Sequence, residues 1–183
     1  MIRGHEKLRQ DDYPWYEAVS GDEIEQGDIF DNCPVFIPPD DLLLDSSDVP
    51  EILIEDRDVI VMSQTCDMSK KYPKITEVLL CPIWKKSEAP SPVSTLGGLE
   101  NARKGKFPGL HLLNKCNLPS LGNEIRIVDF RRVYSLPLTY MRNIACNHKS
   151  RIRLLPPYRE HLSQSFARFF MRVGLPSDIP AFK

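Results

Sequence analysis

The chain has 183 residues, of which 42% are hydrophobic, and this is enough for one domain with a single sizeable core. No segment approaches the roughly 18 consecutive apolar residues of a membrane-spanning helix, and the N-terminus lacks an apolar signal core, so we expect no membrane association. The five cysteines are odd in number and widely spaced, which argues against a disulfide framework and favours reduced thiols in the cytoplasm.

Charge is distributed unevenly along the chain although the net charge is only −1. Residues 1–60 contain 17 Asp/Glu and 4 Lys/Arg, whereas residues 125–183 contain 3 Asp/Glu and 11 Lys/Arg. This acidic head and basic tail allow two interpretations. The tail binds phosphate or an acidic partner, or the two ends neutralise each other within the fold.

Short β-branched and apolar segments predict most of the domain to be strands. Between them, residues 40–51 predict an acidic loop, and residues 55–58 predict a hairpin turn. The strands are expected at residues 27–37, 52–54, 59–62, 78–83 and 124–130, the last prolonged through 131–138.

Two segments predict helices. Residues 85–109 are rich in Lys, Ser, Pro and Gly and predict a surface excursion with a short helix near 95–104. Residues 158–173 have apolar side chains at helical spacing, preceded by Pro157 and followed by Gly174, which is typical of an amphipathic helix. The sequence therefore predicts a mainly β fold, a small barrel closed by a C-terminal helix.

The most informative segment spans residues 58–84, where two apolar runs flank a polar insert. The first run ends in Ser63-Gln64-Thr65-Cys66-Asp67. Because strand ends commonly display functional side chains, we expect these residues beside a groove.

Cys66 has three interpretations: a small buried apolar residue, a ligand contact or a nucleophile. A nucleophile needs a base, and the chain offers four histidines for it, although no spacing links one to Cys66. The neighbouring carboxylate of Asp67 would oppose thiolate formation and has a plainer role as a cap of the following backbone. Cys146 and His148 lack a second pair at zinc spacing, so we expect neither a metal nor a cofactor.

Four short motifs follow one another along the chain. They are G-D-I at 27–29, V-I-V-M-S at 59–63, C-P-I at 81–83 and I-R-I-V-D at 125–129. Their succession resembles the MazF/PemK-type toxin family over roughly residues 25–138. The resemblance implies an SH3-like barrel, often a homodimer, that binds single-stranded RNA and in active members cleaves it without metal. The expected organisation is an N-terminal arm (1–24), a barrel domain with long loop insertions (25–140) and a helical extension packed on it (141–183).

The resemblance also suggests site residues. Arg57 lies near the position of the family's arginine and would act as acid or charge stabiliser, with Asp67, Asp58 or His111 as the base. The alternative is that Arg57 is a turn residue paired with a neighbouring aspartate in water. The residues expected to contact RNA or a partner are Ser63, Gln64, Thr65, Cys66, Trp84, Arg126, Arg131 and Arg132.

Arginines interleaved with aromatic residues between positions 126 and 153 also suit single-stranded RNA. Two main hypotheses result. The first is a MazF/PemK-like RNA-binding protein of a prokaryotic toxin–antitoxin, stress or defence system, with or without endoribonuclease activity. The second is a non-catalytic module that binds a protein partner such as an antitoxin or a regulator. Trp84, where the family has a threonine, favours the second, and the basic tail favours the first; a Cys66-dependent enzyme is a distant third.

Overall fold

The computed structural model describes residues 14–37, 53–115, 118 and 123–171. The predicted acidic loop, most of the expected N-terminal arm and residues 172–173 of the predicted closing helix lie outside this range. The described residues form eight antiparallel strands and three α-helices, so the predicted mainly β class with a C-terminal helix is confirmed. The strands are β1 (Tyr16–Val19), β2 (Asp28–Ile37), β3 (Leu53–Val61), β4 (Glu77–Lys85), β5 (Leu110–Leu113), β6 (Arg126–Asp129), β7 (Tyr134–Pro137) and β8 (Arg151–Leu154). The helices are α1 (Leu96–Arg103), α2 (Leu138–Asn147) and α3 (Tyr158–Phe170).

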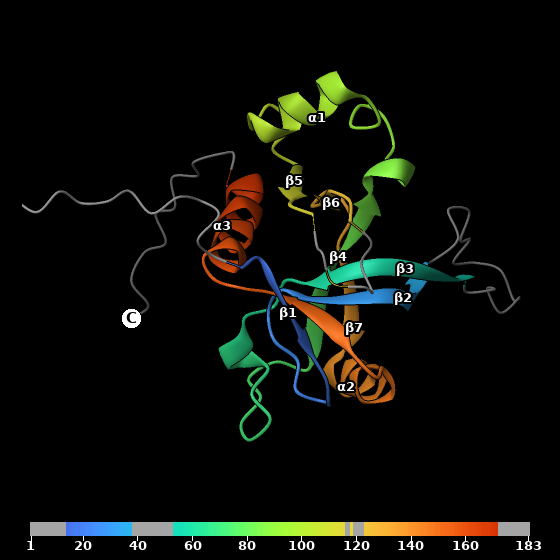
Figure 1. Ribbon diagram of the computed structural model, residues 1–183. Helices are drawn as coiled ribbons and strands as arrows, with labels where there is room; N and C mark the ends of the chain where they lie inside the picture. Colours follow the sequence, from blue (N-terminus) through green and yellow to red (C-terminus); the bar gives the residue numbers. More distant parts are fainter. Residues whose placement is uncertain (1–13, 38–52, 116–117, 119–122, 172–183) are drawn as a thin grey trace, which may run out of the picture.

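The strands pair in the order β1-β8-β2-β3-β4-β6-β5, and β7 pairs with β4 outside this path. In Figure 1, α1, β5 and β6 lie at one end of the molecule, α2 lies at the other, and α3 stands beside β5. The expected barrel is not confirmed. Within the described residues the two end strands, β1 and β5, do not pair, and no closed barrel is seen.

Consecutive side chains of a strand point to opposite faces of the sheet. In the central strands, consecutive residues are apolar, so both faces of the sheet are apolar there. Ile29 and Ile60 belong to a core cluster that includes Tyr158 and Leu162 of α3. The adjacent residues Phe30, Val59 and Val61 belong to a second cluster, which includes Met141 and Ala145 of α2. A helix thus covers each face of the sheet, and a separate helix on each face removes the need for the sheet to close on itself.

A third, smaller cluster lies beneath α1. Leu99 and Ala102 of this helix pack against Leu110 of β5 and Ile127 of β6. Thr95 caps the helix, since its hydroxyl accepts a hydrogen bond from the Gly98 backbone N–H at 3.0 Å. The short helix expected near residues 95–104 is confirmed.

The predicted hairpin turn at residues 55–58 is wrong, because the two strands expected around it are one continuous strand, β3. Glu55, Asp56 and Arg57 lie opposite Val35, Pro34 and Cys33 of β2. The backbone ladder continues through these charged residues because their side chains stay exposed or half-buried, so extending the strand buries no unpaired charge. Further along, the two apolar runs of segment 58–84 pair with each other, since Val59, Ile60 and Val61 of β3 lie opposite Pro82, Cys81 and Leu80 of β4.

The segment 131–138 does not prolong the strand before it. β6 ends at Asp129, whose carboxylate accepts a hydrogen bond from the Arg131 backbone N–H at 3.0 Å in a turn. β7 then pairs with β4, and α2 begins at Leu138. The predicted boundary at residue 140 falls inside α2, and β8 beyond it joins the sheet beside β2.

Asp28 is the centre of a buried ion cluster that joins β2 to β8. Its carboxylate is fully buried and accepts hydrogen bonds from Arg151 Nε at 2.8 Å and from Arg153 Nε at 2.5 Å. Arg153 also pairs with Glu25 at 2.6 Å, and Glu25 pairs with Arg159 of α3 at 3.3 Å. In these contacts the acidic head and the basic tail neutralise each other.

None of the described helices has the length and apolar character that crossing a lipid bilayer requires.

Replacing Asp28 by Asn should destabilise the fold strongly. The substitution leaves the buried guanidinium of Arg151 without its counter-charge and leaves Arg153 paired with Glu25 alone, and breaking a buried pair in this way costs about 3–5 kcal/mol. Urea unfolding followed by circular dichroism measures the loss. The matched control is Asp22→Asn, which removes an exposed pair with Lys70 and should leave the unfolding midpoint unchanged. Equal effects of the two substitutions would contradict a central role for Asp28.

Candidate functional site

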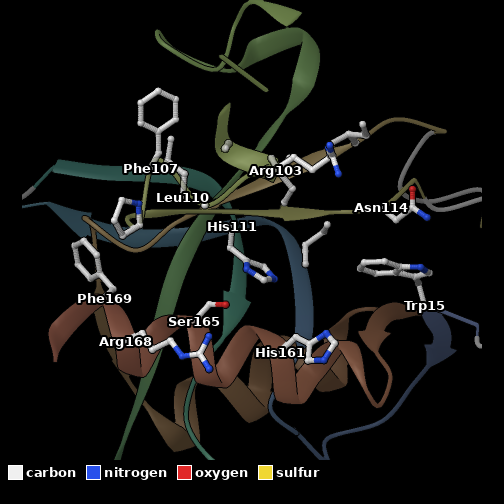
Figure 2. Close-up of a pocket in the computed structure, with 16 residues that line it drawn as sticks. Trp15, Arg103, Phe107, Leu110, His111, Asn114, His161, Ser165, Arg168 and Phe169 are labelled. Carbon is white, nitrogen blue, oxygen red and sulfur yellow. The ribbon is translucent and has the colours of Figure 1, made fainter. Parts of the chain in front are cut away.

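A cavity of about 790 Å³ lies between α3 and the α1–β5 segment. Figure 2 shows His111 of β5 extending toward α3, with Ser165, Arg168 and His161 of α3 on the facing side. The cavity is lined by Trp15, Ala102, Arg103, Gly105, Phe107, Pro108, Leu110, His111, Leu112, Leu113, Asn114, Ile125, His161, Ser165, Arg168 and Phe169.

The polar lining of this cavity follows from the periodicity of its elements. On α3, His161, Ser165 and Arg168 recur at intervals of four and three residues, so they share one face of the helix. Leu162 is fully buried on the neighbouring stripe and holds that helix against the sheet. On β5, Leu110 and Leu113 are buried while His111 is half-buried at the cavity wall.

His111 is a neutral imidazole at neutral pH. Burial, and secondarily the nearby positive charge of His161 when protonated, lower the pKa of His111 from the ordinary 6.5 to about 4. Its ring packs against Phe130 with ring centroids 6.0 Å apart and an angle of 26° between the ring planes. A neutral histidine held in this way can accept a proton or a hydrogen bond from a ligand.

The cavity carries positive charge with no carboxylate in its wall. Among the described residues that line it, none is Asp or Glu. Arg103 has an exposed partner outside the wall, since Glu100 accepts two hydrogen bonds from it at 2.7 Å. Arg168 is exposed in this wall, and within the described residues it makes no ion pair.

The hydroxyl groups of the central polar segment stabilise the fold. Ser63 is buried, and its hydroxyl accepts a hydrogen bond from the Leu79 backbone N–H at 2.9 Å. The Thr65 hydroxyl accepts one from the Gln26 backbone N–H at 3.1 Å, and the Gln26 side chain donates to the Met62 carbonyl at 2.8 Å. These bonds hold the turn after β3 to the segment that precedes β2.

The other members of this segment are closer to solvent. Gln64 donates its side-chain N–H to the Ser163 hydroxyl of α3 at 3.1 Å, which helps to dock that helix. Asp67 pairs with Lys74 at 3.3 Å, and the exposed Cys66 thiol donates to the Asp67 carboxylate at 3.6 Å. None of the five residues of the segment 63–67 lines the cavity.

Arg57 and Asp67, the two residues expected to share a catalytic role, have different partners. Arg57 forms an ion pair with Glu55, and its guanidinium lies over the Trp84 ring, 5.6 Å from the ring centroid. Asp67 pairs with Lys74 instead. The structure thus brings Arg57 and Trp84 together, and neither of them lines the cavity.

The three arginines expected to contact RNA also differ in their surroundings. Arg126 is only 2% exposed and pairs with Asp58 at 3.2 Å. Arg131 is held by the Asp129 carboxylate through two hydrogen bonds of 2.8 Å, whereas Arg132 is exposed. In the described part of the chain, no three His, Cys, Asp or Glu side chains are placed to hold a metal ion.

The sequence indicates His111 as a candidate base, but it does not indicate the neighbours of that residue in the cavity. The helical spacing of His161, Ser165 and Arg168 is the available signal, since it places three polar side chains on one face of an amphipathic helix. Nothing local in the sequence connects that face with β5.

Comparisons with protein-family models, with curated proteins and with solved structures found no match. Function is therefore inferred from the residues themselves.

The lowered pKa of His111 should make the protein less stable in acid. Between about pH 6.5 and pH 4, His111 binds a proton in the unfolded chain but stays neutral in the folded chain. The free energy of unfolding should thus fall by up to about 3 kcal/mol between these pH values, and His111→Gln should remove that dependence. Urea titrations at several pH values measure it, and an NMR titration midpoint of His111 near 6.5 would contradict it.

Proposed function

We propose that this protein binds single-stranded RNA in the cavity between α3 and β5. One observation carries the proposal: Arg103, Arg168, His111 and His161 lie among aromatic side chains in a wall without carboxylates. Single-stranded nucleic acid combines a phosphate charge with planar bases, and proteins bind it through cations and aromatic rings. The cavity volume of about 790 Å³ also lies within the range of known ligand sites.

Two further considerations support the same ligand. The sequence resembles MazF/PemK-type toxins, whose ligand is single-stranded RNA, and this likeness does not depend on the cavity. The described cysteines, Cys33, Cys66, Cys81 and Cys146, are all free, which suits the reducing cytoplasm where RNA is found. We accordingly propose a cytoplasmic role in a prokaryotic toxin–antitoxin, stress or defence system.

The presence of His111 and His161 in one cavity wall favours a second function at the same site, RNA cleavage without metal. Neutral His111 can remove the proton from a ribose 2′-hydroxyl, whose oxygen then attacks the adjacent phosphorus. The 5′-oxygen leaves with a proton donated by the imidazole of His161, giving a 2′,3′-cyclic phosphate and a 5′-hydroxyl end. Arg168 is available to stabilise the negative charge that grows on the phosphorane oxygens.

Arg168→Ala should weaken RNA binding and make it less sensitive to salt. For a single strand, removing one cation that neutralises a phosphate reduces the slope of log K against log salt by about 0.7. Fluorescence anisotropy of a labelled oligoribonucleotide over a range of salt concentrations gives both quantities. The control is Lys71→Ala, an exposed cation in the loop between β3 and β4 that should change neither.

RNA binding that does not change in Arg168→Ala would place the RNA outside this cavity, and no RNA binding by the unmodified protein would leave the protein-partner hypothesis.

Cleavage of single-stranded RNA in the presence of EDTA should be lost in His111→Gln and in His161→Gln. Each substitution removes one proton-transfer group, and removing such a group typically costs a factor of about 10²–10⁴ in rate. Denaturing gels and detection of the cyclic phosphate measure the reaction.

Arg57→Ala and Asp67→Asn are the matched controls and should cleave like the unmodified protein. Loss of cleavage in these two variants, with the histidine variants active, would move the site to the residues expected from the sequence. RNA left intact by the unmodified protein would remove the cleavage proposal and leave the binding proposal standing.

A further inference from the structure

The aromatic segment at the start of the described chain contributes one residue, Trp15, to the cavity. Its indole stacks on the Tyr158 ring with centroids 3.5 Å apart and an interplanar angle of 10°. The backbone around it is fixed, since the Trp15 carbonyl accepts a hydrogen bond from the Leu155 N–H at 2.8 Å. The Tyr16 hydroxyl donates to the Asn114 carbonyl at 2.7 Å. The indole is therefore held in a defined orientation.

Within the described residues, the ring contacts of this indole are the stack on Tyr158 and a tilted contact with the Tyr16 ring. Tyr158 is buried and covers one ring face, yet it does not line the cavity, whereas Trp15 does. Of the two stacked rings, Trp15 is therefore the one that a ligand in the cavity can reach. In Figure 2, Trp15 lies at one end of the cavity beside His161 and Asn114. A half-buried tryptophan in a cavity wall presents a large planar surface that water solvates poorly.

We infer that Trp15 is the surface on which one base of the bound RNA stacks, extending the existing Tyr158–Trp15 stack by one ring. This inference rests on the proposed RNA binding and adds which residue holds the base. In Figure 2, His161 lies beside Trp15, His111 lies near the middle of the cavity and Arg168 lies toward its other end, so an RNA backbone that continues from a base on Trp15 would pass these side chains. Because every base has a planar face, the contact accepts any base and sets position more than sequence.

The inference is tested by removing either partner of the stack. Binding of a short labelled oligoribonucleotide is compared with binding of the same oligomer carrying abasic sugars, for the unmodified protein and for Trp15→Ala. Losing one base–aromatic stack weakens binding by roughly 5- to 100-fold. We expect that loss on removing the base or the indole, and no further loss on removing both. Trp15→Phe should retain most of the affinity, since a ring remains.

The matched control is Trp84→Phe, which alters the other tryptophan of the chain, beneath Arg57. It should bind RNA normally, and its remaining indole fluorescence, from Trp15, should be quenched by the oligomer and much less by its abasic form.

Three results decide the matter. Base-containing RNA bound equally well by Trp15→Ala overturns the inference while the proposed function stands. Equal binding of intact and abasic oligomers overturns it as well, and this comparison needs no variant, so misfolding of Trp15→Ala cannot obscure it. No RNA binding by the unmodified protein overturns the proposed function and the inference together.

Discussion

The buried carboxylate of Asp28 is the constraint on which the arrangement of the whole domain depends. A fully buried charge is tolerated only when it is paired and hydrogen-bonded, and here two arginines of β8 supply both conditions. The pairing joins the beginning of the described chain to its end. It also sets β8 beside β2, and α3 follows β8 directly in the chain. The cavity exists because α3 lies there.

This use of charge changes the meaning of the basic tail. Arg151 and Arg153 of β8 pair with Asp28, and Arg126 of β6 pairs with Asp58. The interpretation in which head and tail neutralise each other therefore holds for these contacts. Arg168 differs from these arginines because it lies in the cavity wall, where none of the described lining residues is Asp or Glu. Local charge on a concave surface matters more for binding than the sum over the chain.

The polar segment after β3 illustrates how a conspicuous sequence feature can serve the scaffold. Ser63 and Thr65 accept backbone hydrogen bonds, and Gln64 bonds to Ser163 on α3. Ser163 lies on the same helix as His161 and Ser165, so the segment supports the helix that carries the polar wall of the cavity. Its contribution to function is to hold that helix in place.

The sequence by itself determined the strong local features: the apolar strands around 59–61 and 78–83, the amphipathic helix from Tyr158, and the mainly β class. It did not reveal α2 or the four-residue strands β1 and β8, since such short segments carry little periodicity and depend on their neighbours. It also could not join His111 to His161, which are far apart in the chain. Only the tertiary structure places these two histidines in one cavity wall, because the docking of α3 depends on buried contacts from several strands and no local pattern encodes them.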